Sequence, residues 1–141
     1  MAILEKTLTG ISGEFYAAAE LSRRNYAVSI TFGNTKAIDL LAEKDGNTYM
    51  FQVKSIQSRK SISFNMAIKS VKKACHYILV NLNADTLEAP EFFILTSDEM
   101  KESLNFAQSG RDWVNYNFLK RSGQFYNAWS KIKPLEAELL Q

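Results

Sequence analysis

The chain has 141 residues, of which 46% are hydrophobic and 23% charged, and its formal net charge is +2. This length suits one domain with its own core, so we expect residues 1–141 to form a single domain, with a core over about 4–96 and a helical, aromatic extension over about 97–141. No apolar run approaches the roughly 20 residues that span a bilayer. The segment Met1–Ser12 lacks the pattern of a secretory signal, and we therefore expect a cytoplasmic protein.

The chain has one cysteine and one histidine, Cys75 and His76. A lone cysteine cannot form an internal disulfide, and a zinc cluster of Cys and His ligands is excluded. Because neighbouring residues of a strand point to opposite faces, a Cys–His catalytic pair is disfavoured as well. A serine-type hydrolase is also disfavoured, since the candidate serines have no histidine close in sequence.

The first predicted element is an amphipathic helix from about Leu4 to Arg24. Its apolar residues recur at spacings of three and four and form the face that we expect to be buried: Leu4, Leu8, Ile11, Phe15 and Ala18. Gly10 and Gly13 weaken this helix locally.

Three strands are predicted next. The segments Tyr26–Phe32 and Ala37–Ala42 are rich in apolar and β-branched residues, and a polar break separates them. The sequence Lys44–Asn47 then supplies the positive φ angles of a tight hairpin turn, and Thr48–Lys54 alternates polar and apolar residues beyond it. We therefore expect the second and third strands to form a hairpin.

The rest of the chain alternates between shorter segments. We predict a helix over about 66–74, strands over 76–82 and 92–96, a helix over about 97–106 and a final helix over 125–132. Ser97 is the expected N-cap, because acidic residues follow it in the first turn. The late aromatic residues are expected to pack together rather than to stack on bases, and they are Trp113, Tyr116, Phe118, Phe125, Tyr126 and Trp129.

Asp39 lies in the middle of the second predicted strand, where a carboxylate is costly to bury unless it is paired, hydrogen-bonded or bound to a cation. On the third strand, Gln52 and Lys54 share one face. Because paired strands lie about 4.8 Å apart, these three side chains are placed to address one ligand. Glu14 borders the buried stripe of the first helix and is a fourth candidate. The alternatives are a chance buried Asp39–lysine pair and a solvated Glu14.

The basic residues are unevenly distributed. No Asp or Glu lies between Gly46 and Ala84, whereas that stretch contains Lys54, Arg59, Lys60, Lys69, Lys72 and Lys73. Such one-sided charge favours a surface that contacts phosphates. The alternative is a solvated helix face.

The spacing of the polar residues resembles a known active-site motif. An Asp, twelve intervening residues and then Gln52-Val53-Lys54, preceded by a helix with Glu14, resembles the motif of the PD-(D/E)XK nuclease superfamily. The element order over residues 4–82 resembles its common core, and Gly13-Glu14 resembles its archaeal Holliday-junction resolvase branch. In this chain Ile38 replaces the eponymous Pro. Gln52 replaces the usual second acid, as in the Mrr-like restriction enzymes, and removes one negative charge.

The resemblance implies an α/β (α+β) fold of the restriction-endonuclease type. Its mixed central sheet of about five strands would be flanked by helices in the order αβββαβ, followed by a C-terminal strand and helices. It implies Mg²⁺ or Mn²⁺ as cofactor, held by Asp39, Gln52, the Val53 backbone carbonyl and Glu14. Lys54 would position or help deprotonate the attacking water.

The expected reaction is therefore hydrolysis of phosphodiester bonds, in DNA above all. The nucleic acid would contact Arg59, Lys60, Lys69, Lys72 and Lys73, and the resemblance is compatible with a homodimer. Two alternatives stay open. Because Gln52 lowers the charge of the metal site, one is a catalytically inactive module that binds nucleic acid. The other is an accessory or immunity subunit whose basic stretch would bind an acidic partner protein.

Overall fold

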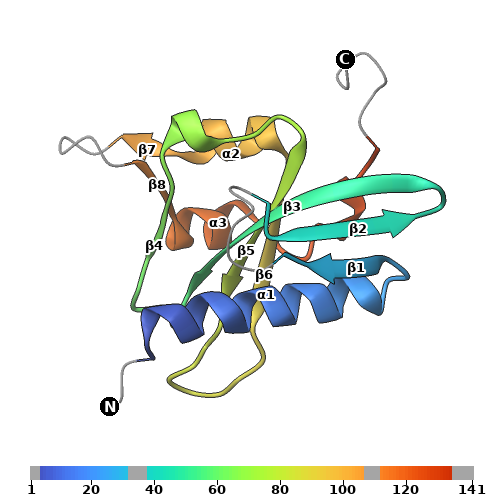
Figure 1. The fold of residues 1–141 in the computed structure, drawn as a ribbon. Helices are drawn as coiled ribbons and strands as arrows, with labels where there is room; N and C mark the ends of the chain where they lie inside the picture. The colour runs from blue at the N-terminus through green and yellow to red at the C-terminus, as the bar shows by residue number, and fades with distance from the viewer. Residues whose placement is uncertain (1–3, 32–37, 107–111, 135–141) are drawn as a thin grey trace.

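The computed structural model describes residues 4–31, 38–106 and 112–134 (Figure 1). Its elements are α1 (Lys6–Ser22), β1 (Ala27–Ile30), β2 (Leu40–Lys44), β3 (Asn47–Ile56), β4 (Ser63–Asn65), the 3₁₀ turn η1 (Ile68–Ser70), β5 (Cys75–Asn81), β6 (Glu91–Leu95), α2 (Ser97–Ser103), β7 (Asn105–Phe106), β8 (Asp112–Asn115), α3 (Tyr116–Ser122) and the 3₁₀ turn η2 (Trp129–Lys131). A mixed five-stranded sheet has the order β1-β2-β3-β5-β6, and a three-stranded sheet has the order β4-β8-β7. The predicted fold class is confirmed.

The first three strands of the five-stranded sheet form an antiparallel meander, β3 pairs with β5 in parallel, and β6 returns antiparallel to β5. The β2–β3 turn contains Asp45 with a φ of 52° and Gly46 with a φ of 79°. These are the left-handed conformations that a tight hairpin turn needs, and they confirm the predicted turn.

Hydrophobic side chains pack on both faces of this sheet. On one face, Ala17 and Leu21 of α1 pack with Phe51 and Val53 of β3. The other face lies under β4, β8, α2 and α3 and includes Tyr77. All seven residues of β5 are buried, as expected of a strand covered on both faces.

The predicted buried face of α1 is wrong for Leu8, Ile11 and Phe15, whereas Leu4 and Ala18 pack partly buried against the core. Leu8, Ile11 and Phe15 are 42–53% exposed, whereas Gly13, Ala17 and Leu21 are buried. The structure buries the small residues because the helix approaches β3 very closely. A Cβ atom on Gly13 would lie 1.7 Å from the Ser55 Oγ.

The helix predicted over 66–74 is replaced by the single turn η1. The Ile68 amide donates to the Asp112 Oδ2 at 2.7 Å, a contact from β8 that draws this segment out of helical geometry. Val71 then adopts an extended conformation, with a φ of −70° and a ψ of 122°, and is buried in the core. Burial of a β-branched residue outweighs the weak local preference for a short helix.

The predicted final helix is also wrong. The Phe125 carbonyl accepts from the Ile94 amide at 2.9 Å, and the Asn127 amide donates to the Phe92 carbonyl at 2.9 Å. This segment therefore runs beside β6, and only η2 forms a helical turn. The N-cap of α2 is Thr96 instead of Ser97: its hydroxyl accepts from the Glu99 amide in a capping box.

The late aromatic residues pack as predicted in three cases. Tyr116, Phe125 and Trp129 are buried.

Within the described residues, no helix has the length and apolar character needed to cross a membrane.

Candidate active site

Asp39 lies immediately before β2, which corrects its predicted position in the middle of the strand. Its amide donates to the Phe51 carbonyl at 2.9 Å, and Phe51 also pairs with Leu40. Two successive residues thus face one residue of β3, an arrangement that redirects a side chain. The Asp39 Oδ2 accepts a hydrogen bond from the Val53 amide at 2.7 Å.

The backbone at Asp39 is held by the residue that follows β1, which the sequence analysis missed. The Thr31 hydroxyl lies 2.5 Å from the Ile38 carbonyl and 3.2 Å from the Asp39 carbonyl. The Thr31 amide donates to the Asp39 backbone carbonyl at 3.0 Å. Thr31 is therefore a positioning residue. No local sequence signal identifies it, because the contact depends on the strand pairing.

The Val53 backbone carbonyl was predicted as a metal ligand. The amide and carbonyl of one strand residue point to the same edge of the strand. The Val53 amide points to Asp39, and β2 pairs with β3 only as far as Phe51. The Val53 carbonyl is therefore directed to the edge at which the Asp39 carboxylate lies.

Glu14 meets Asp39 from α1. Burial raises the pKa of Glu14, and the negative charge of Asp39 and a side-chain hydrogen bond with it raise that pKa further. Two neighbouring acidic side chains of this kind form a donor pair that a divalent cation would stabilise. Across the described parts of the chain, no group of three His, Cys, Asp or Glu side chains is placed to hold a metal ion.

Gln52 and Lys54 project from β3 into a cavity of about 540 Å³. Its other described lining residues are Met66, Ala67, Lys69, Ser70 and Lys72. Gln52 is only 8% exposed, and its Oε1 has no hydrogen-bond partner among the described residues. An unpaired buried oxygen of this kind destabilises a protein by about 1–3 kcal/mol, so a neutral oxygen ligand for a hard cation fits this position.

The four predicted residues thus form two pairs that meet at Val53. Glu14 and Asp39 interact directly, and Asp39 binds the Val53 amide. Gln52 and Lys54 are the neighbours of Val53 in β3 and line the cavity.

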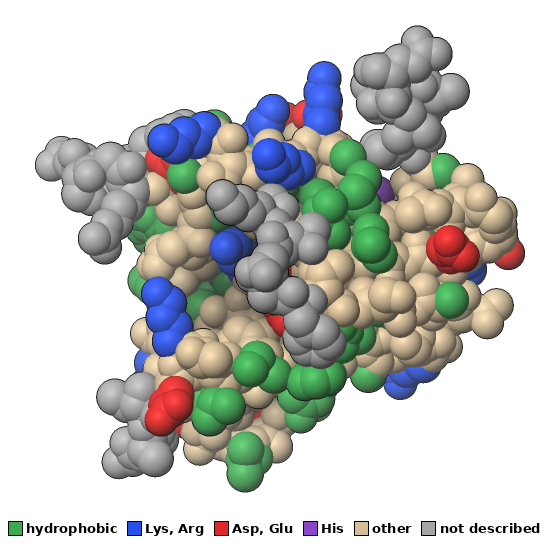
Figure 2. Space-filling model, in the orientation of Figure 1, with side chains coloured by type: hydrophobic (Ala, Val, Ile, Leu, Met, Phe, Trp, Pro, Cys, Tyr) green, Lys and Arg blue, Asp and Glu red, His purple; other side chains and the backbone are tan. Residues whose placement is uncertain are grey.

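Lys69 and Lys72 line the same cavity as Lys54 and are themselves exposed. Their segment is fixed to the scaffold, because the Lys72 amide donates to the buried Tyr77 hydroxyl at 2.7 Å. Figure 2 shows Lys and Arg side chains gathered over η1 and the segment that follows it. Lys73 is exposed in that segment.

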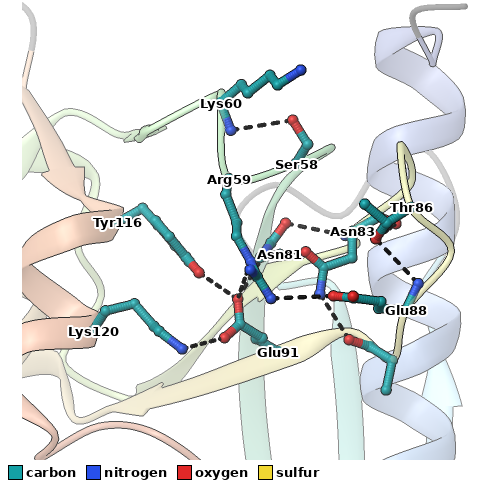
Figure 3. Close-up of polar contacts among 11 residues, drawn as sticks. Ser58, Arg59, Lys60, Asn81, Asn83, Thr86, Glu88, Glu91, Tyr116 and Lys120 are labelled. Atoms are coloured by element: carbon teal, nitrogen blue, oxygen red, sulfur yellow. Dashed lines mark hydrogen bonds and ion pairs between the residues drawn. The ribbon is translucent and has the colours of Figure 1, made fainter. Parts of the chain in front are cut away.

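Arg59 has a different environment from these lysines. Its Nη2 lies 3.3 Å from the Glu88 Oε2, and its Nε lies 3.9 Å from the Glu91 Oε1, in the polar network of Figure 3. Lys60 is exposed beside it, with its side chain directed away from that network (Figure 3). The predicted basic stretch is therefore divided in the structure. Its lysines Lys54, Lys69 and Lys72 line the cavity, whereas Arg59 belongs to the polar network.

Glu91 is the centre of this network and was missed by the sequence analysis. It is 6% exposed and accepts from the Tyr116 hydroxyl at 2.5 Å, the Lys120 Nζ at 2.6 Å and the Asn81 Nδ2 at 2.8 Å. Burial by itself would raise the pKa of Glu91, but the hydrogen bonds from Lys120, Tyr116 and Asn81 lower it overall. The network joins β5, β6 and α3.

Comparison with known proteins places this geometry in context. A family model described as PD-(D/E)XK endonuclease matches residues 5–85, the range that contains all four candidate residues. Among solved structures, the chain is similar to that of a bacterial homing endonuclease, I-Ssp6803I, with a TM-score of 0.65, 15% identity and 91% of each chain covered. At that identity the likeness concerns the fold. No curated protein matches the chain.

Proposed function

Because the chain belongs to the PD-(D/E)XK endonuclease family, we propose that it is a divalent-metal-dependent nuclease that hydrolyses phosphodiester bonds in DNA. One observation carries the proposal: Glu14 interacts with Asp39, Asp39 binds the Val53 amide, and the neighbours of Val53 in β3 are Lys54 and Gln52 with its unpaired Oε1. The similarity to an endonuclease structure supports a nucleic acid as substrate.

The residues present fit a hard divalent cation. Asp39, the Val53 carbonyl, Gln52 and Glu14 would hold Mg²⁺ or Mn²⁺ through oxygen atoms. Such an ion polarises the scissile phosphate and lowers the pKa of its bound water. Lys54 positions the attacking water and offsets the negative charge that develops on the phosphate in the transition state.

The lysines of the cavity wall bind the flanking phosphates. Lys69 and Lys72 are exposed at the cavity that contains Lys54, so a phosphate at Lys54 has two further positive charges nearby. This contact depends on charge rather than on base sequence.

The direct test is cleavage of plasmid and linear duplex DNA in Mg²⁺ or Mn²⁺ by wild type, Asp39→Asn and Lys54→Met. We expect both variants to lose at least roughly 100-fold in rate, because electrostatic transition-state contacts contribute on that scale. Asn keeps an oxygen for the Val53 amide, so Asp39→Asn should stay folded by circular dichroism. Asp85→Asn, on the exposed loop after β5, is the matched control. Undiminished cleavage by both site variants would remove these residues from the mechanism.

Calorimetric titration of Mn²⁺ tests the metal site without a substrate. Wild type should bind and Asp39→Asn should bind much more weakly, because the variant removes one charged ligand. The absence of Mn²⁺ binding to the wild type would contradict the proposed site.

The neutral Gln52 favours one second candidate, a nuclease-like module that binds nucleic acid without cutting. That protein would bind DNA with a steep dependence on salt and show no cleavage. Lack of DNA affinity even at low salt would instead favour the protein-binding accessory subunit.

A further inference from the structure

The outer face of α1 is apolar and exposed. Leu8, Ile11, Phe15 and Tyr16 have exposed fractions of 48%, 42%, 53% and 47%. The opposite side of the helix packs on β1, β3 and β5. Figure 1 shows α1 along one side of the molecule, and Figure 2 shows hydrophobic side chains gathered over it.

This orientation reverses the usual arrangement of a surface helix, whose apolar stripe faces the core. The outer face also has no charge along most of its length, because the other residues on it are Thr7, Ser12, Ala19 and Ser22. The charged residues within α1, namely Lys6, Glu14 and Glu20, lie elsewhere on its circumference. A contiguous uncharged face of this kind marks a surface that another molecule covers.

We infer that a second copy of this chain packs on this face, with the two α1 helices antiparallel across a twofold axis. The large residues Ile11, Phe15 and Tyr16 lie around the middle of the helix. An antiparallel pair therefore brings these residues of one helix against the same residues of the other. A central apolar patch that meets its own copy is what a twofold interface requires.

The charged residues at the two ends of α1 also favour a second copy of the chain as the partner. Glu5 and Arg23 flank α1 and are separated by roughly five turns of 3.6 residues, so they lie on the same side of the stripe. Both are exposed, and the Arg23 side chain is 69% exposed while it pairs with Glu20 at 3.0 Å. In an antiparallel twofold pair, Glu5 of each copy lies beside Arg23 of the partner subunit.

This inference goes beyond the proposed function and does not depend on it. A helix of 17 residues is about 25 Å long, so one helix pair gives an interface near the lower end of stable sizes. The dimer should therefore form in a concentration-dependent way. It would place two candidate sites on one particle.

The test is sedimentation of the whole chain over a range of protein concentrations, without DNA or metal. Wild type should change from monomer to dimer, and Ile11→Lys and Phe15→Glu should stay monomeric. Both variants should keep their circular dichroism and melting temperature, because the replaced side chains are exposed. Leu87→Glu, at an 86% exposed apolar residue elsewhere, should dimerise like wild type. The inference would be overturned if the wild type stays monomeric at every concentration, or if Ile11→Lys and Phe15→Glu dimerise like the wild type.

Charge exchange tests the antiparallel arrangement. Glu5→Arg and Arg23→Glu should each weaken dimerisation about three- to tenfold, since each places like charges side by side. The double variant should recover most of the wild-type affinity. Failure of the double variant to recover would overturn the proposed pairing of the helices.

Discussion

At the scale of single residues, Gln52 sets the charge of the candidate metal site. It is a buried amide with an unpaired oxygen, next in the strand to the residue whose amide binds Asp39. A carboxylate here would add a charged ligand for a cation, and in the cation's absence it would be a buried acid with no partner among the described residues.

We therefore expect opposite effects of Gln52→Glu on metal affinity and on the stability of the metal-free protein. Mn²⁺ affinity should rise roughly tenfold or more, because ligand charge controls the affinity of such sites. The melting temperature without metal should fall. Calorimetry and thermal unfolding measure the two effects, and Gln124→Glu at an exposed position should change neither. A higher melting temperature without metal would contradict this account of the site.

The lowered pKa of Glu91 predicts how the stability of the protein depends on pH. Its pKa is lowered from the ordinary value of 4.5, so its interactions stabilise the folded state above that pH and are lost as the pH falls through the folded pKa. Glu91→Gln should lower stability at pH 7 by about 2 kcal/mol, since it weakens charged hydrogen bonds to Lys120 and Tyr116. The difference from wild type should shrink below pH 4.5 in thermal unfolding.

The matched control for this pH series is Glu88→Gln, whose side chain is 62% exposed. It should follow the wild-type curve. A constant difference between Glu91→Gln and wild type at every pH would show that the effect is one of packing.

At the scale of elements, α1 is positioned by a glycine. Gly13 lies against Ser55 of β3, and the next residue, Glu14, meets Asp39. A Cβ atom added to Gly10, three residues earlier, would meet no other atom within 4 Å. The two glycines of one helix therefore have different roles, close packing for Gly13 and none for Gly10.

Substitution by alanine should separate these two roles. Gly13→Ala should destabilise the protein by about 1–3 kcal/mol, because its methyl group overlaps Ser55. Gly10→Ala should stabilise it by up to about 1 kcal/mol through helix propensity. Denaturant unfolding measures both. Equal effects of the two substitutions would argue against close packing at Gly13.

At the scale of the whole molecule, charge is divided between the cavity and the network around Glu91. Lys69 and Lys72 are exposed at the cavity, whereas Arg59 is paired with Glu88 and Glu91. Of these three residues, only Lys69 and Lys72 line the cavity that contains Lys54.

For DNA binding we expect Lys69→Ala and Lys72→Ala each to reduce the slope of log affinity against log salt by about 1. Arg59→Ala should leave that slope unchanged and lower thermal stability instead. Fluorescence anisotropy at several salt concentrations measures the slopes. A reduced slope for Arg59→Ala would assign this residue to the DNA surface.

Local sequence was sufficient for much of the fold. The strands of the five-stranded sheet, the Asp45-Gly46 turn and the helical state of residues 6–22 follow from periodicity and turn chemistry over a few residues. The sequence did not predict β4, β7, β8 or α3. The spacing of Asp39 and Gln52-Val53-Lys54 was sufficient to suggest the family, because a hairpin fixes which residues of two strands lie near each other.

Tertiary contacts decided the rest. The buried face of α1 depended on how closely Gly13 approaches Ser55, and the turn at η1 depended on Asp112, 44 residues away. The pairing of Arg59 likewise depended on Glu88 and Glu91. Sequence periodicity reports which residues are apolar, but the partner that covers them is set by residues distant in the chain.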